Sequence, residues 1–178
     1  MSWDMADTHL IILYITTILL KPKVIVELGT GFGRATEVFS DACNIVGGKV
    51  YTIDRHPQHP QVIKAKERLE DRENIIFLTG DSIEVGKKWE GPADIVFCDS
   101  LHKYEHVLNE LKIWSKKAKV ILVHDIYDVH SRDKPVKFDP YFACEEFVRR
   151  NPEWTFIPIR GRDICPEGIG VLIKNEEK

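Results

Sequence analysis

Short β-branched runs alternate with amphipathic stretches along this chain, and this alternation limits the fold more than any other feature. The first run, Lys23 to Leu28, ends in glycines, and the amphipathic segment from Arg34 to Val46 follows it and is stopped by Gly47 and Gly48. A glycine pair at that place is typical of a helix end. Repetition of such strand–helix units favours a mostly parallel sheet with helices on both faces.

The remaining units follow the same rhythm. Further strands are expected at Val50–Ile53, Ile75–Leu78, Asp94–Cys98 and Lys119–Val123, and helices at Gln61–Arg72, Tyr104–Lys117 and Tyr141–Arg150. The last two expected strands, Trp154–Ile159 and Gly168–Ile173, are separated by a turn-rich segment and would form an antiparallel hairpin. The predicted fold is therefore α/β, a Rossmann-like doubly wound, mostly parallel seven-stranded sheet with a C-terminal antiparallel hairpin.

The 178 residues suit a single domain spanning positions 1–178. The apolar run from Leu10 to Leu20 is too short to cross a bilayer as a helix, and no basic segment precedes it. Residues 1–20 are therefore expected to contain a buried N-terminal helix packed on the sheet. Residues 126–140 are polar and contain two prolines, and we expect them to form an acceptor loop.

Charge and cysteine usage exclude several classes of function. The formal net charge of −3 argues against a surface built to neutralise many phosphates, so no nucleic acid partner is expected. No membrane partner is expected either, and the sequence leaves self-association open. The four cysteines are far apart, which argues against a zinc or disulfide framework and for a cytoplasmic protein with reduced thiols.

A glycine-rich turn follows the first expected strand, in the segment Glu27-Leu28-Gly29-Thr30-Gly31-Phe32-Gly33. Glycines let the backbone turn tightly and let a ligand approach closely, while the amides at the following helix N-terminus face that ligand. The spacing differs from the dinucleotide pattern G-x-G-x-x-G. An acid two residues before the first glycine suits a cationic group and would repel a pyrophosphate.

This segment resembles the first motif of class I S-adenosylmethionine-dependent methyltransferases, E/D-x-G-x-G-x-G. The resemblance implies that Glu27 lies near the cationic amino-acid end of the cofactor and that the loop residues bind it, namely Gly29, Thr30, Gly31 and Gly33. Asp54 closes the second strand and can accept hydrogen bonds from ribose hydroxyls. Asp81 and Ser82 follow the third strand and resemble the loop that meets the adenine, although Asp81 also suits a helix N-cap.

The acceptor side is expected where the fourth and fifth strands end. The segment D-x-x-H-x-Y-E begins at Asp99 and includes His102, and the fifth strand runs into His124 and Asp125. With the closing run Gly168–Lys174, this pattern resembles methyltransferases of the cephalosporin-hydroxylase-like and macrolide-sugar O-methyltransferase subgroup. The resemblance implies a small-molecule acceptor, and we count Asp99 among the cofactor-binding residues as well.

Two chemistries for activating the acceptor remain open. Asp99 and Asp125 could bind Mg²⁺, which prefers oxygen ligands and lowers the pKa of a bound hydroxyl. Catechol-type relatives, however, follow the second acid with an amide, whereas His124 here is a poor Mg²⁺ ligand. The alternative is general base catalysis by His102 or His124, with Asp125 orienting the site.

The predicted function is methyl transfer from S-adenosylmethionine to an O or N atom of a small molecule. An NAD(P)-dependent Rossmann oxidoreductase and a non-catalytic cofactor-binding subunit are the alternatives; the loop spacing and the terminal hairpin count against the first, and the acids and histidines of the cleft against the second. The other histidines carry no functional signal: His56, His59, His106 and His130 are expected at the surface and His9 beside the first helix.

Overall fold

A computed structural model describes residues 7–127, 139–161 and 165–175 of the chain. The elements in chain order are α1 (Asp7–Leu20), β1 (Val24–Leu28), α2 (Arg34–Val46), β2 (Lys49–Asp54), α3 (Pro60–Arg68), β3 (Ile75–Thr79), α4 (Ser82–Lys88), β4 (Ala93–Cys98), α5 (Tyr104–Trp114), β5 (Ala118–His124), α6 (Asp139–Arg150), β6 (Trp154–Gly161) and β7 (Cys165–Lys174).

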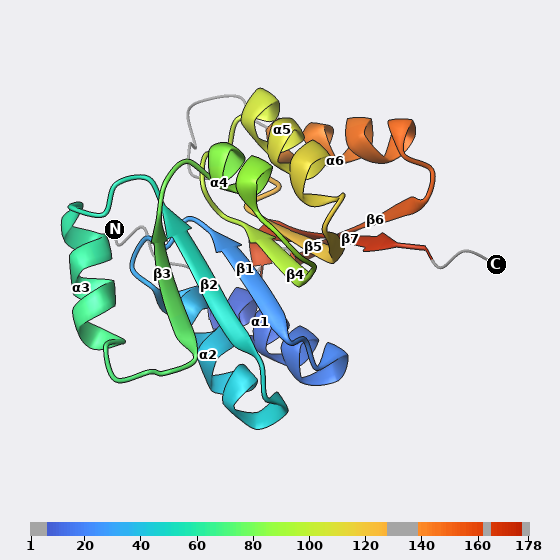
Figure 1. Ribbon diagram of the computed structural model, residues 1–178. Helices are drawn as coiled ribbons and strands as arrows, with labels where there is room; N and C mark the ends of the chain where they lie inside the picture. The colour runs from blue at the N-terminus through green and yellow to red at the C-terminus, as the bar shows by residue number, and fades with distance from the viewer. Residues whose placement is uncertain (1–6, 128–138, 162–164, 176–178) are drawn as a thin grey trace.

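The strands form one seven-stranded sheet in the order β3-β2-β1-β4-β5-β7-β6 (Figure 1). Strands β1 to β5 are parallel, and β7 pairs antiparallel with both β5 and β6. This confirms the predicted mostly parallel sheet with its antiparallel C-terminal pair. The strand order reverses between β1 and β4, which is where open α/β sheets bind their ligands.

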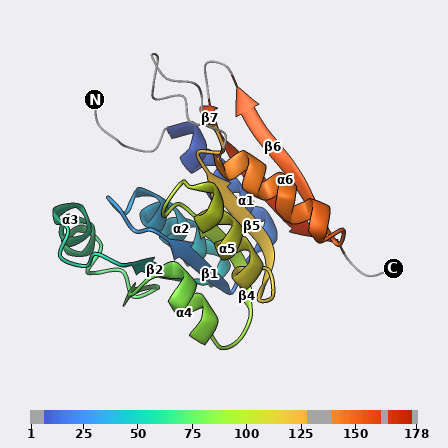
Figure 2. The ribbon, with the colours of Figure 1, turned by 90° about the horizontal axis from the view of Figure 1, so that it is seen from above.

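Helices cover the sheet on both faces. In Figure 1, α1 and α2 lie behind the sheet, and α4, α5 and α6 lie on the viewer's side. Figure 2, the view from above, shows α6 lying alongside β6. Leu13 of α1 and Phe39 of α2 belong to the apolar core behind the sheet, and Leu111 of α5 and Phe147 of α6 belong to the larger core on the other side.

Helix α1 packs against α2 and β7. A buried helix was expected here, but α1 is buried on one side only. Its buried side carries His9, Leu13 and Thr17, spaced four residues apart and so on one helix face. Ile15 and Leu19 lie at the surface, with Leu19 73% exposed. The apolar composition of the segment therefore does not reflect complete burial. Within the described residues, no helix has the length and apolar character that a membrane span requires.

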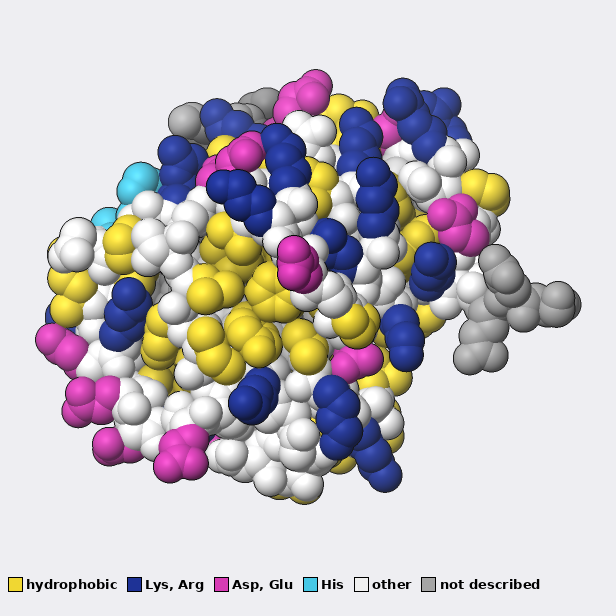
Figure 3. All heavy atoms as spheres, viewed as in Figure 1, with side chains coloured by type: hydrophobic (Ala, Val, Ile, Leu, Met, Phe, Trp, Pro, Cys, Tyr) yellow, Lys and Arg dark blue, Asp and Glu magenta, His cyan; other side chains and the backbone are white. Residues whose placement is uncertain are grey.

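The front face of the sheet is only partly covered near β2 and β3. The helix above them, α4, has just 7 residues, and Tyr51, Leu78 and Trp89 remain partly exposed. Figure 3 shows hydrophobic side chains gathered on this face of the molecule. The edge strand β6 contains Pro158, which lacks an N–H and is tolerated at a sheet edge.

The structure differs from the sequence predictions in three respects: α4 was not among the expected helices, β7 begins at Cys165 rather than at Gly168, and two helices end early. The helix expected to reach Arg72 ends at Arg68, and Arg72 itself pairs with Asp41 of α2. The helix expected to reach Lys117 ends at Trp114, whose buried ring donates a hydrogen bond to the carbonyl of Ser82. Most of the expected acceptor loop, positions 128–138, lies outside the described residues.

Candidate active site

The glycine loop connects β1 to α2 at the carboxyl edge of the sheet. Gly29, Gly31 and Gly33 all have positive φ values, of 102°, 49° and 73°, which residues with a side chain rarely adopt. A Cβ on Gly29 would also overlap the backbone carbonyl of Asp99, so glycine brings this loop against the end of β4. Gly33 precedes α2 without a side-chain cap, and a helix N-terminus of this kind favours negative groups.

Asp54, at the end of β2, supports this loop from the side. Its Oδ2 accepts a hydrogen bond of 3.2 Å from the Thr30 amide and one of 3.5 Å from the Gly31 amide. Its Oδ1 accepts a 2.8 Å hydrogen bond from the His56 amide. A carboxylate has about four acceptor positions, two on each oxygen, so Oδ1 can still accept one hydrogen bond from a ligand hydroxyl.

Glu27 lies beneath the loop and is only 1% exposed. Its Oε2 accepts a 2.5 Å hydrogen bond from the Thr36 hydroxyl, and the Thr30 and Thr52 hydroxyls hydrogen bond each other at 2.7 Å. Burial raises the pKa of Glu27 to about 8, against the opposing effect of its threonine hydrogen bonds. The carboxyl is thus neutral over much of the neutral pH range in this structure.

The loop after β3 is fixed by side-chain hydrogen bonds. Asp81 caps α4, because its Oδ1 accepts hydrogen bonds from the amides of Ile83 and Glu84 at 3.0 and 3.3 Å. The Ser82 hydroxyl is 2.5 Å from Glu110 Oε1 and donates to it. The Ser82 hydroxyl is therefore engaged by a buried carboxylate. A contact of Ser82 with the cofactor stays a prediction.

Glu110 organises a buried polar cluster that the sequence analysis did not find. The fully buried carboxylate of Glu110 accepts hydrogen bonds from Ser82 and Ser100, and His106 Nε2 lies 3.1 Å from it. His106 was expected at the surface, which was wrong, because its ring turns inward to Glu110 and is half-buried. The hydrogen bond to Glu110 raises the pKa of His106. The cluster joins α5 to the loops that follow β3 and β4.

The four residues predicted for the acceptor side lie together. Asp99 Oδ1 is 3.0 Å from His124 Nδ1 and 3.2 Å from His102 Nε2, and Asp125 Oδ1 is 3.1 Å from His124 Nδ1. Asp125 has a φ of 49°, so the chain turns sharply after β5 and brings this carboxylate beside the preceding histidine. We refer to Asp99, His102, His124 and Asp125 as the acceptor cluster.

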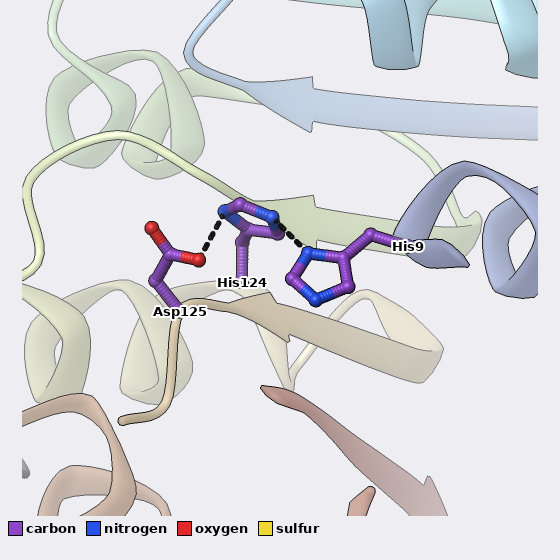
Figure 4. Close-up of side chains that lie close together, drawn as sticks. All are labelled: His9, His124 and Asp125. Atoms are coloured by element: carbon purple, nitrogen blue, oxygen red, sulfur yellow. Dashed lines mark hydrogen bonds and ion pairs between the residues drawn. The ribbon is translucent and has the colours of Figure 1, made fainter. Parts of the chain in front are cut away.

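A third histidine, His9 of α1, joins the acceptor cluster from behind (Figure 4). His9 Nδ1 and His124 Nε2 are 2.7 Å apart and share a hydrogen. His9 was expected beside the first helix with no functional signal; it lies within α1 instead, its ring is 1% exposed, and it directly contacts a predicted site residue. The position of His9, four residues before Leu13 and so on the same helix face, was the signal in the sequence that could have predicted its burial. His56 and His59 are exposed as expected, and His130 lies outside the described residues.

Opposite pKa shifts mark the members of this cluster. Burial alone would raise the pKa of Asp99, but the nearby rings of His124 and His102 outweigh it and hold that pKa well below its usual range. Burial also opposes the charge of His124, yet Asp99 and Asp125 raise its pKa to about 9. Burial and the charge of His124 lower the pKa of His9 to about 4, so His9 is neutral.

The acceptor cluster does not fit the Mg²⁺ ion that catechol-type relatives suggest. Mg²⁺ takes oxygen ligands in an octahedral arrangement. Here His124 Nδ1 lies between the carboxylates of Asp99 and Asp125, and His102 Nε2 borders Asp99. Imidazole nitrogen is a ligand for zinc and other transition metals rather than for magnesium.

Three solved structures of similar fold are each below 25% identical to this chain. The O-methyltransferase TomG of Streptomyces achromogenes, involved in tomaymycin synthesis and solved with S-adenosylmethionine, is 16% identical with a TM-score of 0.72, covering 97% of this chain and 82% of its own. A Podospora anserina methyltransferase bound to S-adenosylhomocysteine is 14% identical with a TM-score of 0.75, covering 94% and 78%. A Bacillus cereus O-methyltransferase in complex with S-adenosylhomocysteine is 17% identical with a TM-score of 0.71, covering 98% and 84%.

A sequence comparison with protein families gives a direct assignment. A family profile described as a methyltransferase domain matches residues 26–126. The match contains the glycine loop, Asp54, Asp81 and all four members of the acceptor cluster. It covers more than half of the chain and includes the strands β2 to β5 of the sheet. The chain therefore belongs to the methyltransferase domain family.

Proposed function

We propose that this chain transfers the methyl group of S-adenosylmethionine to a hydroxyl oxygen of a small molecule. The observation that carries the proposal is the contact between the glycine loop and the acceptor cluster. Gly29 packs against the backbone of Asp99. A cofactor on the loop and a hydroxyl at the cluster would therefore be neighbours, and methyl transfer depends mainly on such proximity and alignment.

Each part of the cofactor has a suitable group. Asp54 is available to ribose hydroxyls, the loop after β3 to the adenine, and the uncapped N-terminus of α2 to the carboxylate of the methionine moiety. Glu27 lies beneath the same loop and would favour the ammonium group once it is ionised. The structures that carry S-adenosylmethionine or its product in similar folds support this choice of cofactor.

The proposed reaction is a single displacement. The acceptor oxygen forms a bond to the methyl carbon while the carbon–sulfur bond breaks, and its electron pair remains on sulfur as S-adenosylhomocysteine leaves. The hydroxyl proton passes to the acceptor cluster. His102 is the most accessible member at 34% exposed, and Asp99 is 22% exposed, so these two side chains would meet the acceptor first.

Calorimetric titration of the full chain with S-adenosylhomocysteine and with NAD⁺ tests the cofactor. We expect S-adenosylhomocysteine to bind and NAD⁺ to give no heat. A panel of phenols and sugars with S-adenosylmethionine then tests the reaction by formation of S-adenosylhomocysteine. Tight NAD⁺ binding without S-adenosylhomocysteine binding would contradict the proposal and favour an oxidoreductase.

A further inference from the structure

The acceptor cluster contains two imidazole nitrogens that face the Asp99 carboxylate at 3.0 and 3.2 Å and that offer a lone pair when their rings are neutral. His124 Nδ1 and His102 Nε2 are both buried, and neither makes a hydrogen bond of acceptable direction to any residue that the structure describes. The His124 side chain is only 7% exposed, so water cannot easily serve in place of a partner. Buried polar atoms of this kind require an explanation, and binding of an ion is one of them.

The spacing of these atoms fits a shared ion. Nitrogen and oxygen ligands lie about 2.0–2.2 Å from zinc, so two ligands of one ion are about 3.0–3.5 Å from each other. Asp99 Oδ1 lies 3.0 Å from His124 Nδ1 and 3.2 Å from His102 Nε2. Asp99 and His102 belong to the segment between β4 and α5, whereas His124 ends β5, and the ligand atoms of the three side chains all lie within 4.8 Å of one another.

His9 selects the form of His124 that could bind an ion. Because His9 Nδ1 lies 2.7 Å from His124 Nε2, a hydrogen on His124 Nε2 can be donated to His9. The lone pair of His124 is then on Nδ1, which is the atom facing Asp99. Histidine ligands of metals generally donate their other ring N–H to a partner that fixes their orientation. Here a neutral histidine takes that role.

We infer that Asp99, His102 and His124 bind a divalent transition-metal ion such as Zn²⁺, with His9 as a positioning residue. Two imidazoles and one carboxylate are donors that suit zinc, cobalt, nickel or iron rather than magnesium. Three protein ligands leave a coordination position for a water or an acceptor oxygen, and the partial exposure of His102 and Asp99 opens that side to the cleft. The Asp125 carboxylate, 3.1 Å from the same nitrogen of His124, borders the site.

The inference rests on the proposed function only for the role of the ion beside the acceptor, so binding is tested on its own. The full chain, free of any histidine tag and treated with a chelator, is titrated with Zn²⁺ by calorimetry and with Co²⁺ by visible absorption. We expect one ion per chain and a Co²⁺ spectrum of low coordination number. Millimolar Mg²⁺ should not displace it.

Variants identify the ligands and the positioning residue. Asp99→Asn and His102→Ala should each weaken Zn²⁺ binding at least about tenfold, as should His9→Ala, since partners of metal ligands typically contribute about 10–100-fold. His9→Asn should restore part of the affinity, because its side-chain oxygen can replace Nδ1 as the acceptor. His56→Ala, which removes an exposed histidine, is the matched control and should bind like the wild type.

Circular dichroism should show that each variant is folded before its affinity is compared. Absence of Zn²⁺ and Co²⁺ binding, equal binding by the folded Asp99 and His102 variants, or displacement by Mg²⁺ would each overturn the inference. S-adenosylhomocysteine titrated into the same samples separates the two proposals. If it binds while zinc does not, only the metal inference fails; if zinc binds while it does not, only the proposed function fails.

Discussion

His9 Nδ1 lies 2.7 Å from His124 Nε2, although the two residues are 115 positions apart in the chain. The contact ties the N-terminal helix α1 to the last residue of β5, at the acceptor side of the site. The orientation of a candidate catalytic residue therefore depends on a helix that lies outside the cofactor loop. Cofactor binding and acceptor activation should respond differently when this contact is lost.

His9→Ala is expected to lower the methyl transfer rate while leaving the affinity for S-adenosylhomocysteine within about twofold of the wild type. Loss of a buried hydrogen-bonding partner should also cost about 1–3 kcal/mol of unfolding free energy. Steady-state kinetics, calorimetry and thermal denaturation measure the three quantities. A variant that loses cofactor affinity as strongly as rate would show that His9 acts on the whole fold rather than on His124.

Asp54→Ala should weaken S-adenosylmethionine binding by about 1.5–3 kcal/mol, because a charge-assisted hydrogen bond to the ribose is lost. The structure adds a second cause, since the same carboxylate holds the Thr30 and Gly31 amides. Asp71→Ala removes an exposed acid elsewhere and serves as the control for charge. Unchanged affinity in a folded Asp54 variant would exclude it as the ribose-binding acid.

Glu27→Gln should stabilise the ligand-free protein at alkaline pH. The folded protein holds a proton on Glu27 between its ordinary pKa of 4.5 and about 8, whereas the unfolded chain has lost it. Stability contributed by this group is therefore complete below pH 4.5 and declines as the pH rises to about 8. At pH 8 the substitution should restore roughly 2–4 kcal/mol.

Thermal denaturation across pH 5 to 9 measures this effect. The difference in melting temperature between the Glu27 variant and the wild type should grow with pH and level off above about 8. Glu70→Gln, at an exposed position on the surface, should leave the wild-type pH profile unchanged. A difference that is constant with pH would mean that Glu27 is ionised in the folded protein throughout.

Gly29→Ala should destabilise the chain more than Gly91→Ala, although the two glycines have similar φ values of 102° and 93°. Gly91 has open space where its Cβ would lie, so the change there costs only the backbone conformation, about 1–2 kcal/mol. At Gly29 the new methyl group would also overlap the Asp99 carbonyl. Urea denaturation compares the two, and equal losses would show that the loop moves away from β4 without cost.

The sequence predicted most of the fold because strand and helix patterns are local. Gly33 and Gly47 lie at the two ends of α2, as expected. The glycine loop could be predicted because it is made of consecutive residues. The acceptor cluster could also be predicted from the sequence, because Asp99 and His124 lie at the ends of neighbouring parallel strands and must meet at one edge of the sheet. Residues at strand ends are thus placed by topology alone.

Residues that act through tertiary packing could not be placed in this way. His9 reaches His124 only because α1 lies behind the sheet next to β7, and no local pattern specifies that packing. Glu110 resembles an ordinary charged helix residue, yet it is fully buried and bonded to Ser82 and Ser100. The spacing of four between His106 and Glu110 was a local signal for an interacting pair, but not for its burial.

The position of β7 between β5 and β6 has a consequence for biosynthesis. Because the ribosome makes β5 well before β7, the nascent chain presents an unpaired hydrogen-bonding edge along Val120, Ile121 and Leu122 until Cys165–Lys174 emerges. Unpaired apolar strand edges are sites of aggregation during folding. The sheet, including the strand next to His124, therefore cannot be completed until β7 has emerged from the ribosome, and chaperone demand should be greatest in the interval between synthesis of β5 and of β7.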